Sequence, residues 1–184
     1  MNVILVHGSY GKPFENWFPW LESELSKKGI SCYVPTFPTP EHQNYCDWGK
    51  LLDYYSNIGF INEDTILIGH SCGAICVTRY LCERNIRIRG LITVSGYNNY
   101  TGNDPHIDEL NSSFYCEDEV IQKIQNLTSQ RISYISTNDP FISQDALENF
   151  SRTIDSQLVV IEGAGHFNAN AGYTEFHQIL EYIL

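Results

Sequence analysis

Short apolar segments alternate with longer amphipathic segments along the chain, and this alternation restricts the possible folds more than any other feature. The apolar segments have the length and residue types of buried strands, and they cover residues 3–6, 30–34, 65–68, 90–94, 131–136 and 157–161. Helices are predicted over residues 16–28, 45–58, 74–84, 117–127, 143–152 and 173–184. Strands separated by helices in this way form a parallel sheet that is covered on both faces. The sequence therefore predicts an α/β fold with about six parallel strands.

The chain is expected to form a single domain over residues 1–184. Its length suits one hydrophobic core, and it contains no internal repeat, low-complexity tract or linker. Roughly 22 residues separate the fourth strand from the next predicted helix, and the polar residues 96–104 among them are expected to form a loop. This segment is too short for a cap domain with its own core, so we expect no cap and a shallow, open pocket.

The charge of the chain limits its partners. Eleven Lys and Arg residues stand against 22 Asp and Glu residues, which gives a net charge of −11. We therefore expect no nucleic-acid partner and no binding to anionic membranes. The first apolar run, residues 3–6, is too short for a signal peptide or a membrane span, and a cytoplasmic location is expected.

The six cysteines do not have the spacing of a metal site. No Cys-x-x-Cys is present, and no Cys and His residues have zinc-ligand spacing. Cys72 and Cys76 would share one helix face, but no second pair completes a ligand set. They are interpreted as buried, reduced thiols, and neither a metal nor a cofactor is expected.

Polar residues follow several of the predicted strands at their carboxyl ends, where parallel sheets place their binding sites. His7-Gly8-Ser9 follows the first strand, Ser71 the third, Asp139 the fifth and His166 the sixth. Serine, acid and histidine in this order are typical of the catalytic triad of α/β-hydrolases. The order predicts Ser71 as nucleophile, Asp139 as orienting acid and His166 as general base.

The segment Gly69-His70-Ser71-Cys72-Gly73 matches the Gly-x-Ser-x-Gly pattern of a nucleophile elbow. A predicted strand precedes it and a predicted helix follows it, as an elbow requires. Glycines two residues before and two residues after the serine remove the Cβ atoms that would collide in such a tight turn. This pattern can also arise in an ordinary strand–helix turn. The predicted strand before it and the predicted helix after it are therefore the stronger indication of an elbow.

His166 and Asp139 lie in segments that suit their predicted roles. His166 is in a glycine-rich loop, and an unperturbed histidine pKa near 6.5 suits a general base at neutral pH. Pro140 disfavours helical geometry for Asp139 and keeps it in a turn beyond its strand. Asp104, after the fourth strand, is the alternative acid.

The residues around these positions are candidates for the oxyanion hole and the substrate pocket. Backbone N–H groups of Cys72, directly after the nucleophile, and of Ser9 or Tyr10, after the first strand, are the expected oxyanion donors. Four further side chains are adjacent in sequence to these positions and are expected to contact substrate: Trp17, His70, Phe141 and Phe167. Trp17 and Phe141 fit a place in the core equally well.

The sequence resembles the family of small serine hydrolases that includes retinoblastoma-binding protein nine. The resemblance covers nearly the whole chain and is carried by His7-Gly8-Ser9 with Asn16-Trp17-Phe18-Pro19-Trp20-Leu21, Ile68-Gly69-His70-Ser71-Cys72-Gly73-Ala74, Ser136-Thr137-Asn138-Asp139-Pro140-Phe141, and Gly165-His166-Phe167 with Thr174-Glu175-Phe176-His177. It implies a compact α/β-hydrolase fold without early antiparallel strands or a large cap. It also implies the triad Ser71, Asp139 and His166.

The expected activity is hydrolysis of a small ester, thioester or amide through an acyl-enzyme on Ser71. An acyltransferase with the same triad is an alternative, because it differs only in the nucleophile that accepts the acyl group. A non-catalytic binding module on a hydrolase scaffold is a second alternative. The partner expected in the first two cases is a small-molecule acyl substrate.

Overall fold

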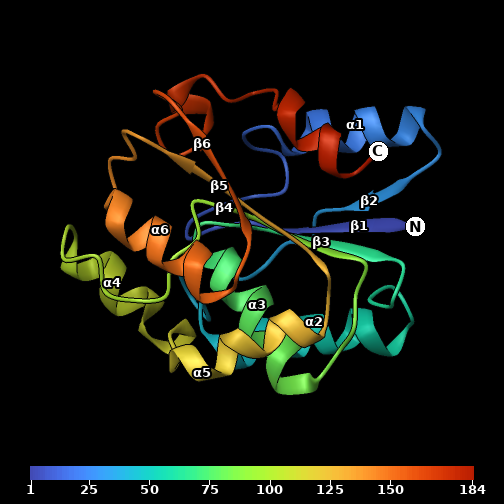
Figure 1. Ribbon diagram of the computed structural model, residues 1–184, viewed down its shortest axis with the longest axis horizontal. Helices are drawn as coiled ribbons and strands as arrows, with labels where there is room; N and C mark the ends of the chain where they lie inside the picture. Colours follow the sequence, from blue (N-terminus) through green and yellow to red (C-terminus); the bar gives the residue numbers. More distant parts are fainter.

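A six-stranded parallel sheet runs through the centre of the computed structural model, which describes residues 1–184 (Figure 1). Its strands are β1 (Asn2–Val6), β2 (Ser31–Tyr33), β3 (Thr65–His70), β4 (Gly90–Val94), β5 (Gln130–Ser136) and β6 (Gln157–Ile161). They lie in the order β2-β1-β3-β4-β5-β6, and every neighbouring pair is parallel. The predicted fold class, a parallel α/β sheet of about six strands, is confirmed.

The strand order brings two segments that are far apart in sequence to the same place. After β1 the chain turns to one side of the sheet to form β2, and after β3 it turns to the other side to form β4. The carboxyl ends of β1 and β3 therefore border a topological switch point, where ligands bind in open α/β sheets. Val6 pairs with Gly69 at this edge, so the loop after β1 begins beside the residues that follow β3.

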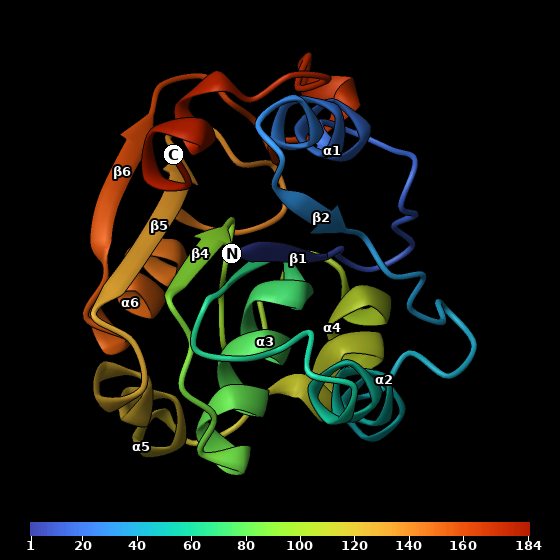
Figure 2. The same cartoon turned by 90° about the vertical axis from the view of Figure 1, so that its right-hand side faces the viewer.

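Helices cover both faces of the sheet (Figure 2), and a cluster of buried hydrophobic side chains lies on each face. The alternation of side chains along β1 sends Val3 and Leu5 to one face and Ile4 and Val6 to the other. The first face packs against α1 (Phe18–Lys27) and the 3-10 helix η4 (His177–Tyr182). The second face packs against α2 (Tyr45–Asn57), α3 (Cys72–Arg84) and α6 (Gln144–Thr153). None of the helices combines the length and the apolar composition that a membrane-spanning helix requires.

The segment between β4 and β5 contains more helical structure than the sequence indicated. It contains α4 (Pro105–Asn111), η1 (Ser112–Phe114), α5 (Asp118–Ile121) and η2 (Gln122–Asn126). Helix α4 was not predicted, although Asp104 caps it by accepting hydrogen bonds from the N–H groups of His106 and Ile107. Together these short elements make no separate cap domain.

Three predicted helices differ from the structure. The helix expected over 117–127 is divided into α5 and η2, and the C-terminal helix expected over 173–184 is the 3-10 helix η4, which follows η3 (Ala169–Ala171). Helix α1 begins at Phe18 instead of after Asn16, because Asn16 has a positive φ of 56° and its side chain accepts a hydrogen bond from Ala169 N. A tertiary contact thus takes the side chain that the sequence predicted as a helix cap.

Candidate active site

Ser71 occupies a strained turn between β3 and α3. Its φ of 56° and ψ of −128° lie in a region that non-glycine residues rarely adopt. Its N–H donates to Val94 O at 2.8 Å, which ties the turn to the end of β4. This conformation is that of a nucleophile elbow, in which the serine side chain stands clear of the backbone.

The glycines around Ser71 are required by the closeness of backbone segments. A Cβ at Gly73 would overlap Val6 O and lie 2.6 Å from His7 O, and a Cβ at Gly69 would lie 2.6 Å from Gly73 O. A Cβ at Gly8 would lie 2.7 Å from the Cβ of Ser71. The glycine positions of the motif therefore allow β1 and its following loop to pack directly against the elbow.

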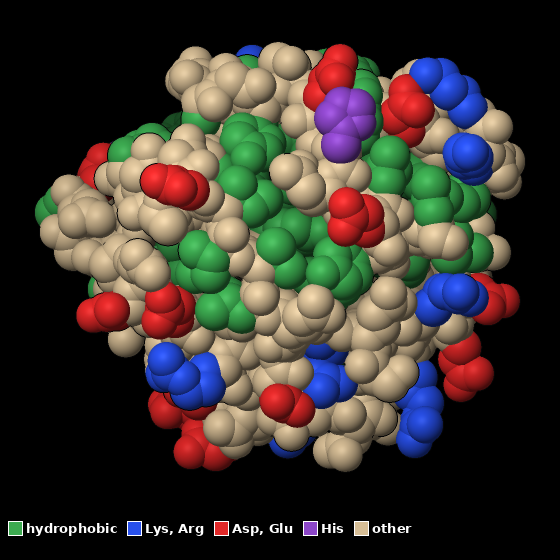
Figure 3. Space-filling view, turned by 45° about the horizontal axis from the view of Figure 1, so that its top comes forward, with side chains coloured by type: hydrophobic (Ala, Val, Ile, Leu, Met, Phe, Trp, Pro, Cys, Tyr) green, Lys and Arg blue, Asp and Glu red, His purple; other side chains and the backbone are tan.

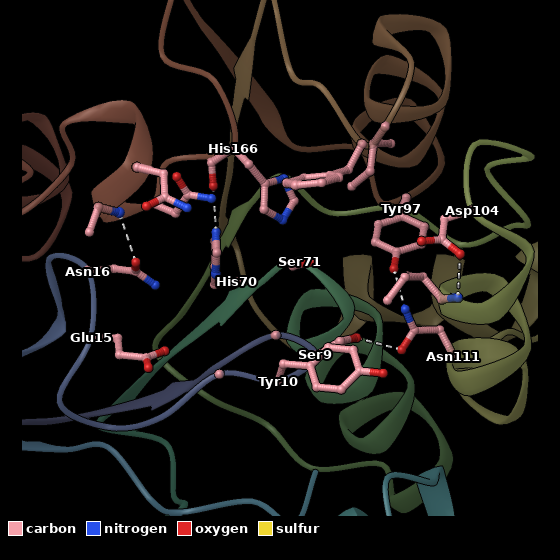
Figure 4. Close-up of a pocket in the computed structure, with 18 of the residues that line it drawn as sticks. Ser9, Tyr10, Glu15, Asn16, His70, Ser71, Tyr97, Asp104, Asn111 and His166 are labelled. Carbon is pink, nitrogen blue, oxygen red and sulfur yellow. Dashed lines mark hydrogen bonds between the residues drawn. The ribbon is translucent and has the colours of Figure 1, made fainter. Parts of the chain in front are cut away.

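His166 and Asp139 form a buried pair at the ends of β5 and β6. His166 Nδ1 lies 2.8 Å from Asp139 Oδ2, and the Asp139 side chain is completely buried. Asp139 Oδ2 also accepts from Ser95 Oγ at 2.8 Å, and Oδ1 accepts from the N–H groups of Phe141 and Ile142. These bonds leave Nε2 of the imidazole free to face the cavity, where Figure 4 shows the ring directed toward Ser71.

The electrostatics of this pair keep the carboxylate ionised. Burial is the largest influence on Asp139 and would raise its pKa. The hydrogen bond and charge of His166, with the bonds from Phe141 N–H and Ser95, outweigh burial and lower the pKa of Asp139. A carboxylate in this state can hold one tautomer of the imidazole and stabilise its protonated form.

Two aromatic rings, those of His70 and Phe141, pack against His166. His70 is buried, and its Nε2–H donates to the carbonyl oxygen of His166 at 2.9 Å. Phe141 packs edge-on against the His166 ring, with centroids 5.0 Å apart. Burial, together with the neighbouring His166, lowers the pKa of His70 to about 3, so His70 is neutral and acts as a hydrogen-bond donor.

The two candidate backbone donors in the loop after β1, Ser9 N–H and Tyr10 N–H, differ in their partners. Tyr10 N–H donates to Thr39 Oγ1 at 2.8 Å and is therefore occupied. Ser9 N–H has no oxygen or nitrogen acceptor in the protein and lies within reach of the Cys72 sulfur. Cys72 is the first residue of α3, so its N–H has no partner within the helix. Of the predicted oxyanion donors, the geometry favours Ser9 and Cys72 over Tyr10.

A cavity of about 810 Å³ opens above Ser71 and is lined by 23 residues. It contains Ser71 and His166, and four of the other predicted site residues line it: Ser9, Tyr10, His70 and Phe141. Its volume lies in the range of sites for drug-sized ligands, so it is roomier than the shallow pocket expected from the sequence. The difference arises because residues 101–111, expected to be mostly a loop, form one wall.

Trp17 and Phe167 do not line this cavity, which corrects their predicted contact with substrate. Both side chains are completely buried, and Trp17 Nε1–H donates to the carbonyl oxygen of Phe167 at 3.0 Å. They pack together with Phe176 in the layer beneath α1. Their role is therefore to anchor the loop that carries His166 to the core.

Sequence reasoning also missed residues that the structure places at the site. Ser95 follows β4 and bonds Asp139, so the rule that located Asp139 at a strand end could have found it. Asn111 and Gln43 contact Ser9, but they had no signal in the sequence because both contacts depend on the placement of other segments. Asp104, the alternative acid, lines the cavity as the cap of α4 and has no hydrogen bond to His166.

The structure contains no cluster of three or more His, Cys, Asp or Glu side chains that could hold a metal ion. All six cysteines are free thiols. Burial raises the pKa of Cys72 to about 12, which keeps this thiol protonated beside the candidate nucleophile. Its Sγ lies 3.4 Å from Ser9 Oγ, within hydrogen-bonding distance for sulfur.

Comparison with known proteins decides the family. Residues 3–184 match the family model described as serine hydrolase. The chain belongs to the serine hydrolase family. It is 27% identical to the serine hydrolase RBBP9 of Rattus norvegicus, over 98% of this chain and 92% of that protein. It is 25% identical to YdeN of Bacillus subtilis (strain 168), which is named as a hydrolase, over 94% of this chain and 88% of that protein.

Solved structures support the same fold. The structure of the YdeN gene product from B. subtilis matches with a TM-score of 0.85 at 24% identity, over 99% of this chain and 96% of that one. Est1E from Butyrivibrio proteoclasticus, solved with bound ferulic acid, matches with a TM-score of 0.67 at 17% identity, over 99% and 89%. The α/β-hydrolase fold and the resemblance to serine hydrolases are thus confirmed, and the protein is a hydrolase by family.

Proposed function

We propose that this protein hydrolyses a small ester, thioester or amide through an acyl-enzyme on Ser71. One observation carries the proposal: the buried His166–Asp139 pair and the strained Ser71 meet at a single cavity. A serine hydroxyl is a weak nucleophile unless a base removes its proton, and an imidazole oriented by a carboxylate is suited to that task.

In the proposed reaction, Ser71 Oγ attacks the substrate carbonyl while His166 Nε2 takes its proton. Asp139 holds the imidazole and stabilises its protonated form. The negative oxygen of the tetrahedral intermediate accepts hydrogen bonds from the N–H groups of Ser9 and Cys72. His166 then protonates the leaving group, and the acyl-enzyme forms.

Water completes the cycle in a second half-reaction. His166 takes a proton from water, which attacks the acyl carbonyl, and the second tetrahedral intermediate uses the same two N–H donors. Its collapse releases the acid and returns the proton to Ser71 Oγ.

The test is covalent labelling with a fluorophosphonate, followed by peptide mapping. An activated serine attacks phosphorus as it attacks a carbonyl, so Ser71 should be labelled in the wild type and labelling should be lost in Ser71→Ala. Asp139→Asn should still fold but should turn over p-nitrophenyl butyrate about 10²–10⁴-fold more slowly.

The matched control for the acid is Asp104→Asn, because asparagine also caps helices and this variant should keep its turnover. Equal labelling of wild type and Ser71→Ala would remove Ser71 from the mechanism. Equal turnover of wild type and Asp139→Asn would remove Asp139.

A further inference from the structure

The loop that carries Ser9 is held by a buried network of side-chain hydrogen bonds. Ser9 Oγ donates to Asn111 Oδ1 at 2.7 Å. Gln43 Nε2 donates both to Ser9 Oγ at 2.9 Å and to Asn111 Oδ1 at 2.7 Å. Ser9, Gln43 and Asn111 come from three separate segments, so the triangle links the loop after β1 to residues 39–43 and to the end of α4.

The network continues from Asn111 and from Gln43. Each continuation gives a hydrogen-bond partner to an amide group that would otherwise be buried without one. Asn111 Nδ2 donates to Tyr97 OH at 2.8 Å. Gln43 Oε1 accepts from Thr39 Oγ1, which in turn accepts from Tyr10 N–H. Because each amide has donors on one side and an acceptor on the other, only one orientation of Gln43 and of Asn111 satisfies the network.

The network has a direct effect on the backbone donors near Ser71. It engages Tyr10 N–H, anchors the Ser9 side chain and leaves Ser9 N–H without an oxygen or nitrogen acceptor, beside the weakly accepting Cys72 sulfur. Asn111 and Gln43 are almost completely buried, so their hydrogen bonds are shielded from competition by water. Figure 4 shows Ser9, Asn111 and Tyr97 along one wall of the cavity, on the side of α4.

We propose that Gln43 and Asn111 are positioning residues that hold the Ser9 N–H as an oxyanion donor. This inference rests on the proposed function, because it assigns a role within the same reaction. It also gives α4 a second task beyond forming a cavity wall: its last residue, Asn111, braces the loop that stabilises the transition state. Neither residue contacts the reacting atoms; both act through Ser9.

The test compares Asn111→Leu and Gln43→Leu with wild type on p-nitrophenyl butyrate. Each change removes the side-chain bonds to Ser9 and places an apolar side chain at the same position. A displaced oxyanion donor weakens transition-state binding more than substrate binding, so kcat should fall about 10–100-fold while KM changes less than about threefold. The Ki of butylboronic acid, whose tetrahedral adduct places an oxygen in the oxyanion hole, should rise by a similar factor.

The matched control is Asn98→Leu. Asn98 lies, like Asn111, in the segment between β4 and β5. It forms hydrogen bonds with Cys116 and Asp118, but it does not line the cavity. Its loss should lower the thermal unfolding temperature without changing kcat or the boronate Ki. Fluorophosphonate titration gives the fraction of active enzyme, so kcat is measured on folded molecules in each variant.

The outcomes separate the two proposals. If Ser71→Ala abolishes labelling but both leucine variants keep wild-type kcat and boronate affinity, the positioning role is wrong and the proposed function stands. If kcat falls equally in Asn98→Leu, the effect is general destabilisation and the positioning role is also wrong. If Ser71 is not labelled at all, the proposed function itself fails.

Discussion

At the scale of single residues, two buried histidines near Ser71 are structural and neutral. His7 Nδ1–H donates to Gly8 O at 2.8 Å, and its Nε2 accepts from Phe37 N–H at 3.1 Å. His70 donates to the carbonyl oxygen of His166. Burial lowers the pKa of both, and that of His70 reaches about 3. His7 can accept from Phe37 N–H only while its ring is neutral, and burial keeps the His70 ring neutral as well.

The low pKa of His70 predicts a loss of stability in acid. In the unfolded chain this histidine takes a proton as the pH falls through about 6.5, whereas the folded state resists protonation down to about pH 3. Within that window, protonation therefore favours the unfolded state. The contribution of His70 alone should lower the unfolding free energy by about 2 kcal/mol as the pH falls from 7 to 5.

His70→Gln isolates this effect, because glutamine places its Nε2 donor near the same carbonyl but does not titrate. Urea denaturation at pH 7 and pH 5 should show that the variant loses about 2 kcal/mol less than wild type. Other titrating groups are common to both proteins and cancel in the comparison. Parallel losses in the two proteins would show that His70 does not resist protonation when folded.

At the scale of elements, the elbow depends on how closely β1, β3 and α3 approach one another. A side chain at Gly73 would collide with the carbonyl oxygens of Val6 and His7, which are backbone atoms of β1 and its loop. Backbone cannot move aside as the end of a flexible side chain can. The start of α3 and the end of β1 can therefore approach this closely only because residue 73 has no Cβ.

Gly73→Ala should therefore lower the unfolding free energy by about 3 kcal/mol and reduce fluorophosphonate labelling of Ser71. Gly49 in α2 is the matched control, because a Cβ there meets no atom within 4 Å. Gly49→Ala should raise the unfolding free energy by up to about 1 kcal/mol, since alanine is the better helix former. Urea denaturation measures both. Equal stability of the two alanine variants would contradict the close approach at the elbow.

At the scale of the whole molecule, the lining of the cavity shares the negative charge of the protein. The net charge is −11, and Figure 3 shows acidic side chains scattered over one face without any single basic patch. Glu15 and Asp104 line the cavity, and no Lys or Arg does. We therefore expect the cavity to disfavour anionic substrates relative to neutral or cationic ones.

Two p-nitrophenyl esters with acyl chains of equal length test this expectation. The kcat/KM of the anionic hemisuccinate should be about fivefold or more below that of the neutral butyrate at low salt, and the difference should narrow as salt screens the charges. Glu15→Gln and Asp104→Asn should raise hemisuccinate hydrolysis and leave butyrate hydrolysis unchanged. If the ratio of the two kcat/KM values depended neither on salt nor on either substitution, the expected effect of the acidic lining would be wrong.

Much of the fold could be predicted from local sequence. Strand positions, helix order and the parallel sheet follow from patterns that repeat within a few residues, and these patterns reflect which side chains face the core. The rule that sites lie at strand ends singled out Ser71, Asp139 and His166, which the structure brings together. Helix α4 was missed even though Asp104-Pro105 carries a cap and a first-turn proline, because the surrounding polar residues indicate a loop.

What the sequence determined by itself was the order of the elements and the residues at their ends, because both depend on neighbours along the chain. The three-dimensional packing was needed to show that Trp17 and Phe167 lie in the core, that Tyr10 N–H is taken by Thr39, and that Asn111 reaches Ser9. These outcomes depend on contacts between segments 29 to 150 residues apart. The free energy of such contacts depends on burial and geometry, which a local pattern does not encode.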